Sequence, residues 1–259
     1  MDITHITPDV TRIRIPFLDV YTSVFLIGTE AGYLLFDTAT YPTDIAEHLL
    51  PALSSLGIRK EALAAVLISH PHRDHAGGLA ALLEECPGLS VIAGSDALLA
   101  THGGARLSVA ADGDVLFGVL RIVAIPGHTA DSIAVLDLRT GTLLSGDGLQ
   151  LYGLFGSGWW GANITMPQAH LAALERLAEL PITAIYPAHD YHPEGDAFIG
   201  QAAVARALAA CREPLFLIRD MIIADPQADD KAIAAAYNEK KTLPPLGWPV
   251  VAAVRRELL

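Results

Sequence analysis

Residues 66–78 place four metal-binding side chains within six positions, directly after an apolar segment. The stretch reads Val-Leu-Ile-Ser-His-Pro-His-Arg-Asp-His-Ala-Gly-Gly, and the four side chains are His70, His72, Asp74 and His75. Imidazole and carboxylate groups are ligands that suit zinc, iron and manganese. Because the chain has only 10 histidines in 259 residues, such a cluster favours a metal site over a polar surface loop.

The order of these residues suggests two ions. Residues two positions apart in an extended segment point to the same side, so His70 and His72 can bind one ion. Asp74 and His75 follow a turn and face another direction, which suits a second ion. The motif therefore predicts half of a two-metal hydrolytic centre.

Three later residues share a common setting. His128, Asp147 and His189 each follow an apolar, strand-like segment and lie in turns that contain glycine or proline. Functional sites of α/β folds gather at the carboxyl ends of strands. Taken with residues 66–78, these three positions are predicted to complete the metal centre.

The hydrophobic pattern predicts alternating strands and helices, followed by a helical tail. Residues 3–37 have the alternation of an antiparallel meander, and residues 43–57 and 76–86 have helical spacing. Strands are expected over 62–69, 89–93, 113–125, 132–138, 142–145 and 182–186, and a helix over 167–179. Helices are expected over 196–211, 214–224, 229–239 and 247–258. The ordering indicates an α/β fold in which helices enclose sheets.

Composition and charge disfavour several classes of protein. No apolar run reaches the ~18 residues that a membrane span needs, and the start of the chain lacks the features of a signal peptide, so a cytoplasmic location is expected. Two cysteines are too few for a disulfide framework. The net charge of −12 disfavours a nucleic-acid partner, because binding to phosphate backbones depends on cationic contacts. A homo-oligomer is left open.

The His-x-His-x-Asp-His loop, the later Gly-His-Thr, the Gly-Asp and the final strand-end histidine together resemble the metallo-β-lactamase superfamily. The resemblance covers about residues 20–190 and implies a four-layer αββα sandwich. The catalytic domain is expected over 1–193, and the helical pattern that follows predicts a C-terminal extension over 194–259 that packs near the active site. The resemblance also implies the ligands of two divalent ions: one on His70, His72 and His128, a second on Asp74, His75 and His189, with Asp147 bridging them.

Such a centre implies a hydrolytic mechanism. Two ions ~3.5–4 Å apart can share a hydroxide, because binding to metal brings the pKa of water towards ~7. The hydroxide is then the nucleophile, and Asp74 is the catalytic residue expected to orient it. Zinc is the expected metal, with iron and manganese as alternatives, because histidine and aspartate suit all three.

The substrate is less constrained. The segment Gly-Asp-Gly-Leu-Gln-Leu-Tyr-Gly is similar to that of glyoxalase II but lacks the Cys-Gly-Arg that follows there. The sequence His-Arg-Asp-His-Ala-Gly-Gly of the metal-binding loop also resembles the β-lactamase-like protein 2 group. Aromatic residues in 149–165 suit an apolar acyl group or ring. The candidate substrate-binding residues are Tyr152, Phe155, Trp159 and Trp160. The favoured function is hydrolysis of a small thioester, ester or lactone.

Three other functions are kept as alternatives. They are a metal-dependent phosphodiesterase or ribonuclease, a mononuclear-iron persulfide dioxygenase, and a non-enzymatic regulatory protein that carries metal.

Two further carboxylates are expected to hold the metal ligands in place without binding metal themselves. Asp37 resembles the family's strand-end aspartate beneath the metal loop, and Asp190 adjoins His189.

Overall fold

The computed structural model describes residues 2–100, 106–151, 162–191, 195–241 and 245–259, which divide into two units by their internal packing. Unit 1 comprises Met1–Ala124 and Ile133–Thr140, and unit 2 comprises Ile125–Ser132 and Gly141–Leu259. The boundary predicted after residue 193 falls inside unit 2, so a separate C-terminal extension over 194–259 stays a prediction.

The main sheet of unit 1 has seven strands in the order of the chain. They are β1 (Asp2–His5), β2 (Val10–Phe17), β3 (Val20–Thr29), β4 (Gly32–Phe36), β5 (Leu63–Ile68), β6 (Ser90–Ala93) and β7 (Arg106–Val109). Strands β1 to β4 pair antiparallel, as the alternating pattern predicted, and β4 to β7 pair parallel. Because β4 and β5 are parallel neighbours, their carboxyl ends meet at one edge of the sheet.

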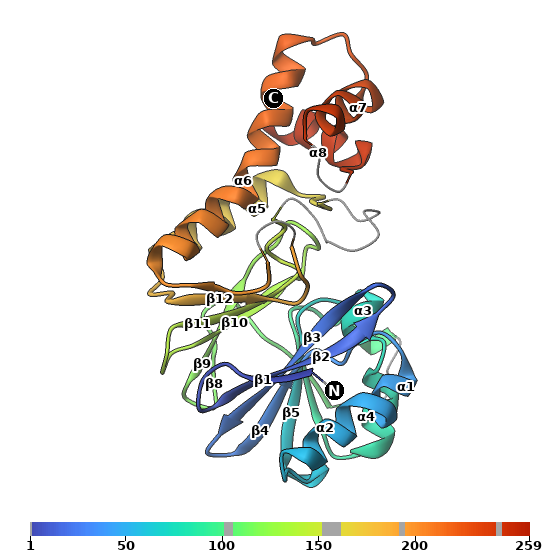
Figure 1. Ribbon diagram of the computed structural model, residues 1–259, viewed down its shortest axis with the longest axis vertical. Coiled ribbons are helices and arrows are strands. Elements are labelled where there is room, and N and C mark those ends of the chain that lie inside the picture. Colours follow the sequence, from blue (N-terminus) through green and yellow to red (C-terminus); the bar gives the residue numbers. More distant parts are fainter. Residues whose placement is uncertain (1, 101–105, 152–161, 192–194, 242–244) are drawn as a thin grey trace. The chain divides into compact units, whose positions relative to one another are not determined.

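Short helices cover one side of this sheet (Figure 1). They are α1 (Pro42–Asp44), the π-helical η1 (Ile45–Leu49), α2 (Leu50–Ser55), the 3-10 helix η2 (Lys60–Ala62), α3 (Arg73–Ala76), α4 (Leu79–Glu85) and the 3-10 helix η3 (Ala97–Ala100). The helically spaced Ile45, Leu49 and Leu53 are buried in the same core as the strands. The helix predicted over 76–86 begins earlier and is interrupted between α3 and α4 at Gly77 and Gly78.

Three more strands of unit 1 form an antiparallel set. They are β8 (Val115–Leu116), β9 (Leu120–Ala124) and β10 (Ile133–Asp137). The single strand predicted over 113–125 was wrong, because the chain turns between β8 and β9. Phe117 and Gly118 have φ values of 49° and 72° there, which no strand allows.

Unit 2 contains a parallel pair of strands whose carboxyl ends meet. Strand β11 (Thr142–Gly146) pairs parallel with β12 (Ala184–Pro187), and β13 (Phe198–Ile199) pairs antiparallel with β12. Helix α5 (Pro167–Glu179) has the bounds that the sequence predicted, with proline at its first position.

Three helices complete unit 2: α6 (Gln201–Ala224), α7 (Asp230–Lys240) and α8 (Trp248–Leu258). Figure 1 shows α7 and α8 gathered beside the carboxyl-terminal half of α6, where the three share an apolar core. The break predicted before Pro214 was wrong. The buried positions on both sides of Pro214 keep helical spacing, for example Leu208, Cys211, Leu215 and Ile218, so packing retains one helix although proline removes a hydrogen bond. Among the residues described, no helix is long and apolar enough to span a membrane.

Candidate metal centre

The first set of predicted ligands lies at the carboxyl end of β5 in unit 1. His70 and His72 lie between β5 and α3, and Asp74 and His75 lie in α3. The ring centroids of His70 and His72 are 4.6 Å apart, and those of His70 and His75 are 4.1 Å apart. The His75 Nε2 atom lies 3.6 Å from Asp74 Oδ2. All four predicted ligands of this motif therefore gather at one strand end.

Asp37 supports this loop from the end of the neighbouring strand β4. Its Oδ1 accepts the backbone N–H of Ser69 at 2.7 Å, and its Oδ2 lies 2.9 Å from Ser69 Oγ and 2.7 Å from His75 Nδ1. The side chains of Asp37 and His75 are both fully buried. Asp37 has a φ of 68°, a strained value for a residue other than glycine. Such strain is retained where surrounding contacts over-determine the backbone.

These contacts select the tautomers of two histidines. A carboxylate only accepts hydrogen bonds, so His75 Nδ1 carries the proton that faces Asp37. Ser69 has one hydroxyl proton and donates it in a hydrogen bond to Asp37, so Ser69 Oγ accepts a hydrogen bond from His70 Nδ1–H at 3.0 Å. In the neutral form of each ring the lone pair is then on Nε2, the atom that would bind a metal.

Thr38 holds the other side of the same loop. Its backbone N–H and its hydroxyl both donate to the carbonyl oxygen of His75, at 2.7 and 2.8 Å. Sequence reasoning had found Asp37 but missed Thr38 and Ser69. Only their positions beside Asp37 and His70 could have suggested them, because a single threonine or serine carries no motif of its own.

The second set of predicted ligands lies in unit 2, where Asp147 is placed between two histidines. Asp147 follows β11 and His189 follows β12, so the parallel pairing brings them together. Asp147 Oδ1 lies 3.3 Å from His189 Nε2, and Asp147 Oδ2 lies 3.9 Å from His128 Nε2. Two ligands on one tetrahedral ion, each bound at ~2.1 Å, lie ~3.4 Å apart. One carboxylate oxygen therefore faces each ring at roughly the separation that shared ligands require.

Backbone contacts orient the ring of His128. Its Nδ1 lies 2.8 Å from the carbonyl oxygen of Asn163, which can only accept, so Nδ1 carries the proton and Nε2 the lone pair. The hydroxyl of Thr165 donates to the carbonyl of His128 at 3.1 Å. The turn that carries His128 is thus fastened to residues just before α5.

Tyr191 is a site residue that sequence reasoning missed. Its side chain is fully buried, and its hydroxyl donates to Asp147 Oδ1 at 3.3 Å. Its position two residues after the predicted ligand His189 is the sequence feature that could have indicated a role in the site. Asp190 between them is half-buried, and its supporting role stays a prediction. The predicted substrate residues Tyr152, Phe155, Trp159 and Trp160 lie outside the described residues.

His170 of α5 is a buried histidine behind the His128 turn. It is 1% exposed, and neither ring nitrogen has a hydrogen-bond partner among the described residues. A Cβ atom on Gly127 would come within 2.6 Å of the His170 side chain, so this close packing requires glycine at position 127. Burial lowers the pKa of His170 to about 4, with a smaller contribution from His128. His170 is therefore neutral at pH 7.

This pKa predicts a loss of stability in mild acid. A histidine with a pKa of 6.5 when unfolded and about 4 when folded takes up its proton on unfolding between those values. Its contribution is complete above pH 6.5 and is lost as the pH falls towards 4. We expect protonation of His170 in the unfolded chain to lower the free energy of unfolding by about 2 kcal/mol between pH 7 and pH 5. Urea unfolding at pH 7 and pH 5 should show a smaller decrease in His170→Leu than in the unchanged chain; equal decreases would contradict the assignment.

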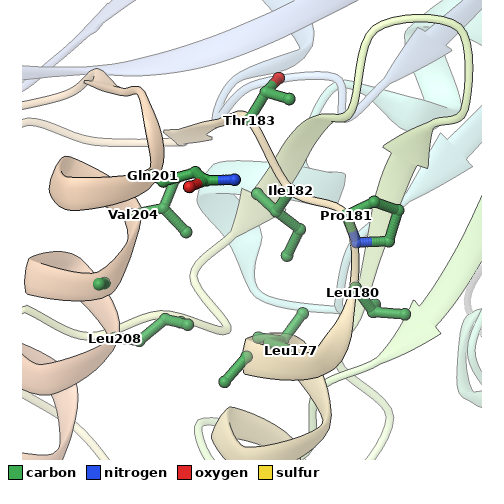
Figure 2. Close-up of a pocket in the computed structure, with 10 residues that line it drawn as sticks. Leu177, Leu180, Pro181, Ile182, Thr183, Gln201, Val204 and Leu208 are labelled. Carbon is green, nitrogen blue, oxygen red and sulfur yellow. The ribbon is translucent and has the colours of Figure 1, made fainter.

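A separate groove lies elsewhere in unit 2, between the end of α5 and the first turns of α6 (Figure 2). Its volume is about 320 Å³, and its lining includes Leu177, Leu180, Ile182, Val204 and Leu208. None of the predicted metal ligands lines this groove. It is therefore not the candidate catalytic site.

The donor chemistry of the two sets suits a divalent transition metal. Within unit 1, His70 with His72, and Asp74 with His75, offer ligand atoms within 4.8 Å of each other, and Asp147 with His189 do so in unit 2. These sets contain imidazole and carboxylate groups and no thiolate. Such donors fit zinc, iron or manganese.

Comparison with known sequences identifies relatives over most of this region. The sequence profile described as the metallo-β-lactamase superfamily matches residues 18–189. A hydroxyacylglutathione hydrolase of Synechococcus sp. (strain JA-3-3Ab) is 33% identical over 168 residues, which cover 61% of this chain and 63% of that protein. A hydroxyacylglutathione hydrolase of Aeromonas hydrophila is 35% identical over 172 residues, covering 65% and 61%. The chain thus spans less than two thirds of the length of these curated relatives.

Comparison of structures identifies the fold. A metallo-β-lactamase family protein of Thermus thermophilus superimposes with a TM-score of 0.67 at 19% identity, covering 97% of this chain and 92% of that protein. At this identity the likeness concerns the fold alone. It confirms the fold class that the sequence predicted.

Proposed function

The chain belongs to the metallo-β-lactamase superfamily, and from this we propose that it is a metal-dependent hydrolase with a dinuclear centre. His70, His72 and His128 would hold one ion, and Asp74, His75 and His189 would hold the second. Asp147 would serve as a ligand to both. The observation that carries the proposal is the position of the Asp147 carboxylate in unit 2, with one oxygen towards His189 and the other towards His128.

The surrounding contacts support the same assignment. Hydrogen bonds at Nδ1 orient the rings of His70, His75 and His128 and make Nε2 the nitrogen that would bind an ion. When bound, the ions supply Lewis acidity that brings the pKa of water towards ~7 and polarises the bond under attack. We propose zinc, with iron and manganese as alternatives that the same imidazole and carboxylate donors also fit.

The protein side chains then have distinct roles. The half-buried Asp74 accepts a hydrogen bond from the attacking water through a carboxylate oxygen and orients it towards the substrate. Asp37 holds His75 in the required tautomer, and the Tyr191 hydroxyl holds Asp147 Oδ1. These residues keep the ligand atoms in place so that little reorganisation is needed during the reaction.

The proposed substrate is a small carboxylic thioester, with esters and lactones as related substrates. Two observations support this class: the relatives named hydroxyacylglutathione hydrolases, and the net charge of −12, which disfavours phosphate polymers. A cytoplasmic location and a small-molecule substrate without a nucleic-acid partner complete the proposal.

Metal analysis together with a substrate panel tests this function. We expect about two ions per purified chain and hydrolysis of an S-acyl glutathione or a simple acyl thioester. A chelator should abolish this hydrolysis, and added Zn²⁺ should restore it. The panel should include a lactone and a phosphodiester. Preferred cleavage of the phosphodiester would favour a nuclease, and oxygen consumption with a persulfide and iron would favour a dioxygenase. A chain without bound metal would contradict the proposal.

A further inference from the structure

The side-chain amide of Gln150 connects two of the proposed ligands in unit 2. Gln150 is 4% exposed, and its Nε2 donates to the backbone carbonyl of Asp147 at 3.0 Å. Its Oε1 accepts the backbone N–H of Asn163, also at 3.0 Å. The carbonyl oxygen of the same Asn163 accepts a hydrogen bond from His128 Nδ1–H, with the two heavy atoms 2.8 Å apart. Three hydrogen bonds in series therefore join Asp147 to His128.

The partners of Gln150 determine which way its amide points. The Asp147 carbonyl can only accept, and the Asn163 N–H can only donate. The residue at position 150 must therefore offer a donor at one end and an acceptor at the other. Glutamate has the same shape but lacks the donor as a carboxylate, and methionine has similar length but lacks both groups.

We propose that Gln150 is a positioning residue for the metal ligands of unit 2, an inference that rests on the proposed function. Asp147 follows β11, whereas His128 lies in a turn that precedes β10. The covalent chain alone therefore does not fix the distance between these two ligands. The Gln150 amide holds the backbone of Asp147 and, through Asn163, the ring of His128. Loss of a partner that hydrogen-bonds a metal ligand directly costs ~10–100-fold in metal affinity or activity, and Gln150 acts on its ligands one step further out, through backbone atoms.

Asn238 provides a matched control within the same unit. Its Nδ2 donates to the backbone carbonyl of Leu246 at 3.0 Å, and its Oδ1 accepts the Leu246 N–H at 2.8 Å. It thus makes the same pair of amide-to-backbone hydrogen bonds, between α7 and α8, with no contact to a proposed ligand. A loss that is merely structural should appear equally in variants of Asn238 and Gln150.

The test measures Zn²⁺ affinity and thermal stability on apoprotein of the full chain. Zn²⁺ is titrated in competition with a chromophoric chelator for the unchanged chain, Gln150→Met, Gln150→Glu and Asn238→Leu. We expect Gln150→Met to bind Zn²⁺ ~10-fold or more weakly. Asn238→Leu should lower the melting temperature but keep the original affinity. Gln150→Glu keeps the shape and the acceptor for Asn163, and serves as the measured variant if Gln150→Met does not fold.

The outcomes separate this inference from the proposed function. If the unchanged chain binds two Zn²⁺ and both Gln150 variants bind them within twofold of it, Gln150 has no positioning role, while the proposed function stands. If the unchanged chain binds no Zn²⁺, Fe²⁺ or Mn²⁺, the proposed function and this inference are both wrong. Selective loss of affinity in the Gln150 variants supports both.

Discussion

Asp147→Ala is expected to reduce bound metal from about two ions to about one and to remove most hydrolysis. In the proposed centre, Asp147 is the one ligand that both ions share, so its loss weakens both and leaves neither with its full set of donors. Metal stabilisation of a hydrolytic transition state is worth several kcal/mol. A loss of about 3 kcal/mol corresponds to a rate decrease of at least ~100-fold.

The measurement is metal content by atomic spectroscopy, together with kcat and KM on the thioester that the unchanged chain hydrolyses best. Asp225→Ala is the control, because Asp225 lies exposed at the end of α6 in the same unit. It should retain both metal and turnover. Unchanged metal content in Asp147→Ala would show that this carboxylate does not bridge two ions.

Gly77→Ala is expected to destabilise the fold by about 4 kcal/mol or more. A Cβ atom at position 77 would lie 2.0 Å from the Thr40 carbonyl oxygen and 2.4 Å from the Arg73 carbonyl oxygen. Both are backbone atoms, so no side chain can rotate away to relieve the clash. Gly77 has an ordinary φ of −66°, so the requirement for glycine comes from packing and not from backbone conformation.

Gly88→Ala is the matched control, because no atom lies within 4 Å of a Cβ placed there. Urea unfolding should give Gly88→Ala a free energy within about 0.5 kcal/mol of the unchanged chain. Gly77→Ala should unfold at a much lower urea concentration or fail to accumulate when Gly88→Ala does. Equal unfolding midpoints for the two variants would show that the backbone around Thr40 can shift to accommodate the added methyl group without a loss of stability.

The identities of the candidate ligands could be read from local sequence, because each has a local signature. Four lie in one short motif, and three follow apolar strands in glycine- or proline-containing turns. Ligand chemistry depends on residue type, and strand ends are visible in hydrophobic periodicity. For the same reason the antiparallel meander, the fold class and helix α5 were predicted correctly.

Longer-range packing decided what local patterns could not. The helical pattern was divided at Pro214 because proline usually ends a helix, whereas α6 continues because its apolar face is buried on both sides of that residue. Residues 113–125 have the composition of a single strand, but the backbone turns at Phe117 and Gly118, and β8 pairs antiparallel with β9.

The sequence by itself determined the kind of fold and the chemistry of the donors, whereas only the tertiary structure decided how those donors are oriented. His75 is held by Asp37, 38 positions away, and His128 by the carbonyl of Asn163, 35 positions away. Gln150 joins the turns of Asp147 and His128 through the backbone. The physical reason is that a hydrogen bond depends on distance and direction in space. Asp37 was predicted because it resembles the family's strand-end aspartate, whereas Asn163 and Gln150 have no periodicity or motif and become visible only when the fold brings distant segments together.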